Sequence, residues 1–226
     1  MQNFNKVDNP VWSSLSETQK PYALDFGNIK FYHPDYAPFG ALEHDKNDVQ
    51  AVTEYSKLIE NFLIVGNKPS LPSTVILKSE LIGLQMILEQ KIELDIKENI
   101  VKLDASNLDE VLKLVKLVYP EYFKKKTFFM GNYYGIFKKN NLVAITGERM
   151  QMNNYIEVSA VVTHPEHTGN GYAKQLIKHT ADHIFNQGKT PILHVAESNL
   201  GPIQLYKSLG FKTRNKISFW NITRAF

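Results

Sequence analysis

The sequence predicts an α/β fold, and three observations support that class. Residues 133–147 read as two strands joined by a tight turn, residues 155–163 as a longer strand, and residues 173–185 as an amphipathic helix. Strands and helices therefore alternate along the second half of the chain, which is typical of a sheet covered by helices. A chain of 226 residues is long enough for one large or two modest domains, each with a core.

Composition excludes several classes of function. The chain is 43% hydrophobic and 22% charged, as ordinary globular proteins are, and no apolar run approaches the roughly 20 residues of a membrane span. Its N-terminus lacks the basic start and apolar core of a signal peptide, so a cytoplasmic protein without membrane partners is expected. The absence of cysteine excludes disulfides, a thiol nucleophile and Cys-ligated metals. A net charge of +3 is too small to indicate nucleic-acid binding.

The N-terminal part holds one clear element. Residues 47–65 repeat apolar side chains at three- and four-residue spacing between a polar cap, Asn47 or Asp48, and Gly66. This pattern predicts an amphipathic helix. Residues 9–43 are rich in turn formers and aromatics without a sustained period, so an ordered but irregular segment is expected there.

Residues 73–96 mix β-branched runs with leucines, a pattern that does not separate a strand from a buried helix. Residues 1–98 are therefore predicted to form a smaller α/β subdomain. A second unit, residues 99–226, begins with the strand pattern "NIVKLD". The segment "ASNLDEVLKLVKLVY" then predicts a helix that is capped by Ser106 or Asn107 and ended by Pro120.

The remaining elements have clear boundaries. Strands are predicted at Tyr133–Lys138 and Leu142–Gly147, joined through Asn140 and Asn141, whose residue type tolerates the positive φ angles of a hairpin turn. After them we expect a strand at Tyr155–Thr163, a helix over residues 173–185 stopped by Gly188, a strand at 191–197, a helix at 199–209 and a strand at 216–222.

The turn between the strand ending at Thr163 and the next helix contains Gly169 and Gly171. A helix start presents unpaired N–H groups and the positive end of the helix dipole, and glycine removes the Cβ atoms that would keep a pyrophosphate away. The pattern indicates a diphosphate cradle, or alternatively a tight connection without a ligand. A P-loop is excluded because Tyr172 follows Gly171, and a dinucleotide fingerprint is excluded because Lys174 stands where a third glycine is needed.

Two segments together, "HPEHTGNGYA" and "ESNLGPIQLYKSLGF", resemble the GNAT superfamily of acetyl-CoA-dependent N-acetyltransferases. The likeness covers about residues 99–222 and is nearest to the glycine N-acyltransferase-like branch. It implies a mixed, mostly antiparallel sheet flanked by helices, in which residues 99–226 form the acyltransferase domain. Residues 1–98 would then be an incomplete GNAT-like unit or a source of acceptor selectivity.

The resemblance also implies a set of binding residues for acetyl-CoA, the expected co-substrate. The backbone of the strand would pair with pantetheine, the turn would bind the pyrophosphate, and the later helix would lie beside the sulfur. These residues are Val161, Val162 and Thr163; Thr168, Gly169, Asn170, Gly171, Tyr172 and Ala173; and Asn199 and Tyr206. The sequence departs from the family pattern at Glu166, Thr168 and Pro202, and the lost positive charge predicts a weaker affinity for coenzyme A.

The implied activity is direct transfer of an acetyl group to a primary amine in a ternary complex, since no cysteine can carry an acyl-enzyme. The amine must first lose a proton. Tyr206 is the expected acid for the departing thiolate. Strand alternation places Glu157 on one face with Ser159, Val161 and Thr163, which makes Glu157 the first candidate base. Glu148 is the second candidate, and water without a dedicated base is the third.

Several interpretations stay open at this level. His179 and His183 lie four residues apart but lack a third ligand, so no metal site is expected. His194 is read as a hydrogen-bonded histidine of the sheet. The acceptor is expected to be a small amine or amino acid rather than a protein amine. The alternatives to an enzyme are a non-catalytic acyl-CoA-binding or sensing module and a nucleotide-binding protein. Trp12, Phe31, Tyr32, Tyr36 and Phe39 would line an acceptor pocket or pack in a core.

Overall fold

The computed structural model describes residues 5–44, 46–118 and 123–225. Its strands form one 11-stranded sheet in the order β1-β2-β3-β4-β11-β5-β10-β9-β8-β7-β6. Neighbouring strands are antiparallel except for two parallel pairs, β3 with β4 and β9 with β10. This is the mixed, mostly antiparallel sheet that was predicted.

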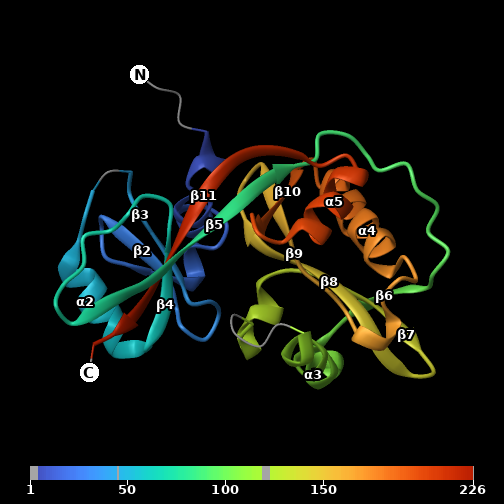
Figure 1. The fold of residues 1–226 in the computed structure, drawn as a ribbon, viewed down its shortest axis with the longest axis horizontal. Helices are drawn as coiled ribbons and strands as arrows, with labels where there is room; N and C mark the ends of the chain where they lie inside the picture. The colour runs from blue at the N-terminus through green and yellow to red at the C-terminus, as the bar shows by residue number, and fades with distance from the viewer. Residues whose placement is uncertain (1–4, 45, 119–122, 226) are drawn as a thin grey trace.

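The N-terminal part builds the left lobe of the molecule (Figure 1). Its elements are α1 (Pro10–Ser16), β1 (Ala23–Asp25), β2 (Ile29–Tyr32), β3 (Phe39–Leu42), α2 (Val49–Leu58), β4 (Asn61–Val65) and β5 (Val75–Ile87). The prediction of an irregular segment before residue 44 was wrong, because strands of three or four residues are too short to show an alternating pattern. The predicted helix over 47–65 was right only as far as Leu58, and its last residues form β4.

The second lobe follows the predicted order of elements closely. It comprises β6 (Ile100–Leu103), α3 (Leu108–Val118), β7 (Tyr133–Lys138), β8 (Asn141–Gln151), β9 (Tyr155–Thr163), α4 (Tyr172–Asn186), β10 (Thr190–Ala196), α5 (Leu200–Ser208) and β11 (Lys212–Arg224). The hairpin turn lies one residue earlier than predicted, since Lys139 and Asn140 have the positive φ angles of 49° and 64°. Asp104 caps a 3-10 helix, Ala105–Asn107, that leads directly into α3, so the predicted caps Ser106 and Asn107 both lie within this turn. Pro120 lies outside the described residues.

Two long strands, β5 and β11, connect the lobes. β5 belongs to the N-terminal part of the chain, yet it lies between β10 and β11. β11 in turn pairs with β4 through residues 219–223. Figure 1 shows the two strands as a crossed ribbon that runs from one lobe to the other. Each half of the chain therefore contributes one long strand to the other lobe. The predicted division into two units after residue 98 stays a prediction.

The two lobes repeat one arrangement. In each, an antiparallel strand pair is followed by a crossover helix and a parallel strand, as β2-β3-α2-β4 and β8-β9-α4-β10. In the second lobe α4 and α5 cover one face of the sheet and α3 covers the other (Figure 1). Among the described residues no helix has the length and apolar character needed to cross a bilayer.

We expect a fragment of residues 99–226 not to fold by itself. Without β5, strands β10 and β11 lose the strand between them, and the core under α4 and α5 loses Leu84, Met86 and Leu88. Thermal unfolding followed by circular dichroism should show one cooperative transition for the full chain and none for the fragment. A fragment that melts cooperatively with a native-like spectrum would show that the halves are independent.

Candidate active site

The site begins where β9 and β10 separate. The two strands pair in parallel only between Thr190–Ile192 and Tyr155–Glu157. Beyond Glu157 the edge of β9 that faces β10 has no strand partner among the described residues, although its other edge stays paired with β8 as far as Thr163. An open edge of this kind can pair with an extended ligand as if the ligand were another strand.

A bulge in β9 marks the separation. Gly147 pairs with Ser159 and Ile145 with Val162, so two residues of β9 lie opposite one residue of β8. At the bulge Ala160 has a φ of 48°, in the left-handed region that costs an L-residue about 1–2 kcal/mol. The alternation of side chains is interrupted there.

The predicted face of β9 was therefore wrong. Val158 and Val161 both pack against the α4 and α5 side, whereas Ala160 and Val162 pack against α3. Glu157 lies before the bulge and Val161 is one of its two residues, so the two residues do not share the face that strict alternation would give them. The sequence carries no signal for this bulge, because no glycine stands at the residue of positive φ.

The glycine turn has free backbone donors. Gly169 and Gly171 have φ angles of 81° and 73°, and a Cβ added at either would meet no heavy atom within 4 Å. No partner is present among the described residues for the N–H groups from Gly169 to Ala173. The Thr168 hydroxyl and the Asn170 amide donate back to loop carbonyls, at 3.1 and 3.0 Å. These bonds hold the loop in shape, and none of them uses the backbone N–H groups of the turn.

Charges around the turn are mixed. Glu166 and Lys174 are both exposed. Lys138 lies 5.4 Å from the ring centroid of Tyr172 and pairs with Glu98 at 2.6 Å. The helix start therefore attracts an anion chiefly through its backbone dipoles, and the side chains add little net positive charge.

A cavity of about 390 Å³ lies between the diverging strands. Its walls come from both lobes and include most of the predicted binding positions on β9 and α5. The lining residues are Phe39, Leu63, Leu81, Gly83 and Phe219; Val115, Val118, Phe123, Thr127, Tyr133 and Arg149; Val158, Ser159, Ala160, Val161 and Val162; and His194, Val195, Ala196, Asn199, Pro202 and Tyr206.

Only one of the five aromatics that were considered for an acceptor pocket lines this cavity. Phe39 does, at the end of the N-terminal lobe that faces the site. Phe31 stacks on Tyr55 at a centroid distance of 3.9 Å, inside the N-terminal core. Tyr32, Trp12 and Tyr36 belong to the hydrophobic cluster around α1. For these four residues core packing is the role that the structure shows.

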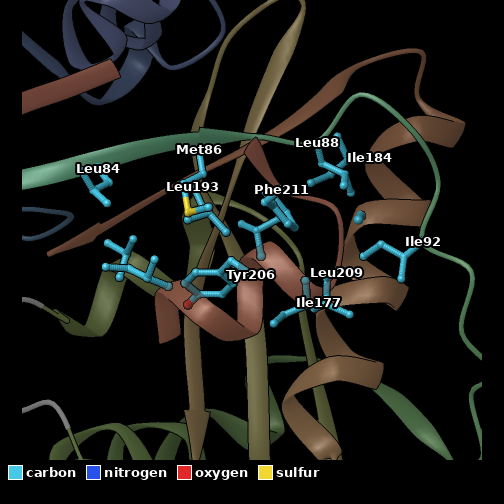
Figure 2. Close-up of a cluster of buried hydrophobic side chains, with 14 of the residues drawn as sticks. Leu84, Met86, Leu88, Ile92, Ile177, Ile184, Leu193, Tyr206, Leu209 and Phe211 are labelled. Carbon is cyan, nitrogen blue, oxygen red and sulfur yellow. The ribbon is translucent and has the colours of Figure 1, made fainter. Parts of the chain in front are cut away.

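Tyr206 reaches the cavity from α5. Its ring packs in the cluster under α4 and α5, and Figure 2 shows its hydroxyl oxygen directed away from Ile177 and Leu209. Burial, together with the negative charge of Glu157, raises the pKa of Tyr206 to about 12. The hydroxyl therefore stays protonated throughout the physiological range, as a proton donor must.

Glu157 is a buried, fully paired carboxylate. Nε and Nη2 of Arg149 donate to its two oxygens at 2.7 Å each, and Nδ1 of His194 lies 2.8 Å from Oε1. Burial alone opposes the ionised form, but the charge and hydrogen bonds of Arg149 and the bond from His194 outweigh it and lower the pKa of Glu157 to about 2. A carboxylate in this state is a poor proton acceptor, so the structure argues against the predicted role of Glu157 as the base.

Gln85 of β5 sets the tautomer of His194. Its Oε1 accepts from Arg214 at 2.9 Å and its Nε2 donates to the Val7 carbonyl at 2.7 Å, so the amide nitrogen is the group 3.0 Å from His194 Nε2. His194 therefore accepts at Nε2 and donates from Nδ1 to Glu157. Sequence reasoning missed Gln85 and Arg149, and no local motif distinguishes them.

Glu148 lies outside the cavity. Its Oε2 accepts from the backbone and side chain of Asn132, at 3.2 and 2.8 Å, and its Oε1 lies 3.3 Å from Nδ1 of His183 on α4. The carboxylate is thus held between β8 and α4, away from the β9 edge. Among the described residues no cluster of three or more His, Asp or Glu side chains could hold a metal ion.

Glu157 is expected to make stability depend on acid pH. Its pKa of about 2 lies below the ordinary value of 4.5, so its stabilisation is complete above about pH 4.5 and is lost as the pH falls toward 2. The shift corresponds to roughly 3 kcal/mol. Denaturant unfolding at a series of pH values should therefore give a steeper decline for the natural chain than for Glu157→Gln.

The same variant has an expected cost at neutral pH. Glu157→Gln leaves the buried Arg149 charge unpaired and should lower the free energy of unfolding by about 3–5 kcal/mol. Parallel pH profiles for the two proteins would mean that folding does not lower the pKa of this carboxylate.

Comparison with known proteins agrees with this geometry. The FR47-like protein family model matches residues 133–220, which run from β7 to β11. No curated protein matches the chain by sequence. Among solved structures, an acetyltransferase assigned to the GNAT family from Novosphingobium aromaticivorans is 28% identical, with a TM-score of 0.89 over 99% of this chain and 100% of the other.

More distant structures share the fold. A GCN5-related N-acetyltransferase-like protein from Streptococcus suis is 13% identical, with a TM-score of 0.63 over 99% of this chain and 95% of the other. Naa50 of Arabidopsis thaliana, in complex with the bisubstrate analogue CoA-Ac-MVNAL, is 16% identical, with a TM-score of 0.50 over 58% of this chain and 100% of the other. The chain therefore has the fold of the GNAT acetyltransferases, and its residues 133–220 match the FR47-like protein family model.

Proposed function

We propose that the protein is an N-acetyltransferase that moves the acetyl group of acetyl-CoA directly to a primary amine of a small molecule in the cytoplasm. One observation carries the proposal: the unpaired edge of β9 leads from the free N–H groups at the start of α4 to the cavity that holds Tyr206. A closer relation to the glycine N-acyltransferase-like branch stays a prediction.

The residues present fit acetyl-CoA. The N–H groups from Gly169 to Ala173 have no partner among the described residues and lie at a helix start, where a pyrophosphate binds favourably. The free edge of β9 from Val161 to Thr163 would pair with the amide-containing pantetheine arm, and Asn199 lies on the cavity wall at the start of α5. Bound acetyl-CoA supplies the activated acetyl group as a thioester.

The chain's own residues then supply three functions. Tyr206 lines the cavity and holds a proton at its hydroxyl oxygen, which it would give to the departing thiolate. Backbone N–H groups along the open edge of β9 would stabilise an oxyanion. The Glu157 carboxylate keeps Arg149 and His194 in place rather than accepting a proton. Because no described lining residue is a carboxylate, we propose that the amine loses its proton to water before attack.

Tyr206→Phe is expected to lower kcat by about 10²–10⁴-fold with an unchanged Kd for acetyl-CoA, because the variant removes one proton donor and keeps the packed ring. Calorimetric titration and an assay of free thiol release would measure the two quantities. In the natural enzyme the rate should not decline between pH 8 and about 10 through loss of the Tyr206 proton, since its pKa is about 12.

The binding titration and the thiol-release assay also distinguish an enzyme from a non-catalytic module. Saturable binding of acetyl-CoA with no turnover of any amine would favour a non-catalytic acyl-CoA sensor. Binding of ATP or NAD in competition with coenzyme A would instead favour a nucleotide-binding protein. Unchanged turnover in Tyr206→Phe would remove this tyrosine from the mechanism.

Gly171→Val should weaken acetyl-CoA binding by about tenfold or more, because the new side chain occupies the open space beside the free N–H groups. Gly188→Val at the other end of α4 is the matched control: its φ is 71° and it too has nothing within 4 Å of a Cβ. Both variants should lose about 1–2 kcal/mol of stability from backbone strain. Equal losses of affinity would place the ligand elsewhere.

A further inference from the structure

We infer that Arg149 selects the acceptor and that the acceptor is an α-amino acid with an apolar side chain, whose carboxylate binds the free edge of the Arg149 guanidinium. The inference rests on the proposed function, since it concerns the second substrate of the same site. It is carried by the geometry of one arginine and by the walls of the cavity.

The Arg149 guanidinium is fixed on two sides. Nε and Nη2 donate to Glu157 at 2.7 Å each, and Cζ lies 4.8 Å from the ring centroid of Phe39. Nη1 has no hydrogen-bond partner among the described residues. The side chain is 18% exposed and lines the cavity. Two N–H donors are thus held in a constant direction and remain available to a ligand.

The charges around the cavity favour an anionic group at that edge. Arg149 is the one lysine or arginine among the described lining residues, and no carboxylate is part of the described wall. The ion pair with Glu157 cancels much of the net charge, so recognition depends on directional hydrogen bonds from Nη1. Hydrogen bonds to a carboxylate are about twice as strong as those to a neutral oxygen.

The other walls favour an apolar side chain. Phe39 and Leu63 of the N-terminal lobe, Phe219 of β11, and Val115 and Val118 of α3 all line the cavity. A charged side chain placed there would lose water without finding a partner. The volume of about 390 Å³ suits a small molecule.

The positions of Arg149 and Tyr206 also favour an acceptor that is held by its carboxylate. Arg149 on β8 and Tyr206 on α5 line the same cavity, on either side of the open β9 edge. A carboxylate bound to Arg149 would therefore hold the neighbouring amine near that edge. Such an anchor turns the attack into an oriented, effectively unimolecular step.

Three matched acceptors test the inference: L-leucine, L-leucinamide and 3-methylbutylamine, which share an apolar chain and differ in the group beside the amine. We expect kcat/KM, corrected for the fraction of neutral amine, to fall in that order. In Arg149→Lys the ratio of the value for leucine to the value for 3-methylbutylamine should fall by about 10- to 100-fold, since any loss that comes from the altered pair with Glu157 affects both acceptors alike. Lysine keeps a positive charge beside Glu157 but loses the planar fork.

3-Methylbutylamine serves as the control for folding. An equal fall for leucine and 3-methylbutylamine would mean that Arg149 is structural, and it would overturn the inference. Equal values of kcat/KM for leucine and 3-methylbutylamine in the natural enzyme would also overturn the inference. This comparison needs no variant, so it tests the inference even if Arg149→Lys does not fold.

A binding measurement distinguishes this inference from the proposed function. L-Leucine is titrated into the natural protein and into Arg149→Lys, each saturated with coenzyme A, and the heat of binding is recorded. Binding that depends on Arg149, with no turnover of any amine, would overturn the acetyltransferase and retain the amino-acid site. Absence of leucine binding to the natural protein would overturn the inference even if other amines are acetylated.

Discussion

The buried ion pair between Glu157 and Arg149 is the interaction on which the site depends. A charge without a partner in this position would cost several kcal/mol, so each neighbour has to be held in place. His194 donates to Glu157, Gln85 donates to His194, and Arg214 donates to both Gln85 and Asp8. The resulting chain of hydrogen bonds crosses β8, β9, β10, β5 and β11, and so joins strands from both halves of the sequence.

The exchange of β5 and β11 makes this network possible. Gln85 comes from the N-terminal part of the chain, but it meets His194 because β5 lies beside β10. The same exchange brings the wall of the N-terminal lobe, with Phe39 and Leu63, up to the cavity. The N-terminal lobe therefore contributes to the site through β5 and a few apolar side chains.

The two parts of the site are built in different ways. The glycine turn relies on backbone N–H groups and a helix dipole, which need few charged side chains, and this accounts for the presence of Glu166 and Thr168 beside it. The cavity relies on side chains fixed by distant partners. We therefore expect the departures at Glu166 and Thr168 to weaken the first part only modestly.

Local patterns in the sequence determined much of the second lobe. The strands Tyr133–Lys138 and Tyr155–Thr163, the helix near residues 173–185 and the glycine turn were predicted, because periodicity, caps and positive φ depend on neighbouring residues. The strands before residue 44 escaped prediction because they are short, and the apolar run at Asn61–Val65 fits a helix as well as a strand until β11 pairs with it.

Only the tertiary structure decided the state of Glu157, the face of Val161 and the parts played by Arg149 and Gln85. The low pKa of Glu157 follows from burial and from the charge that the fold brings near it. The direction of the Val161 side chain follows from a bulge whose residue of positive φ is an alanine, so the sequence gives no sign of it. These properties depend on contacts between residues that are far apart in the sequence, which a local pattern does not contain.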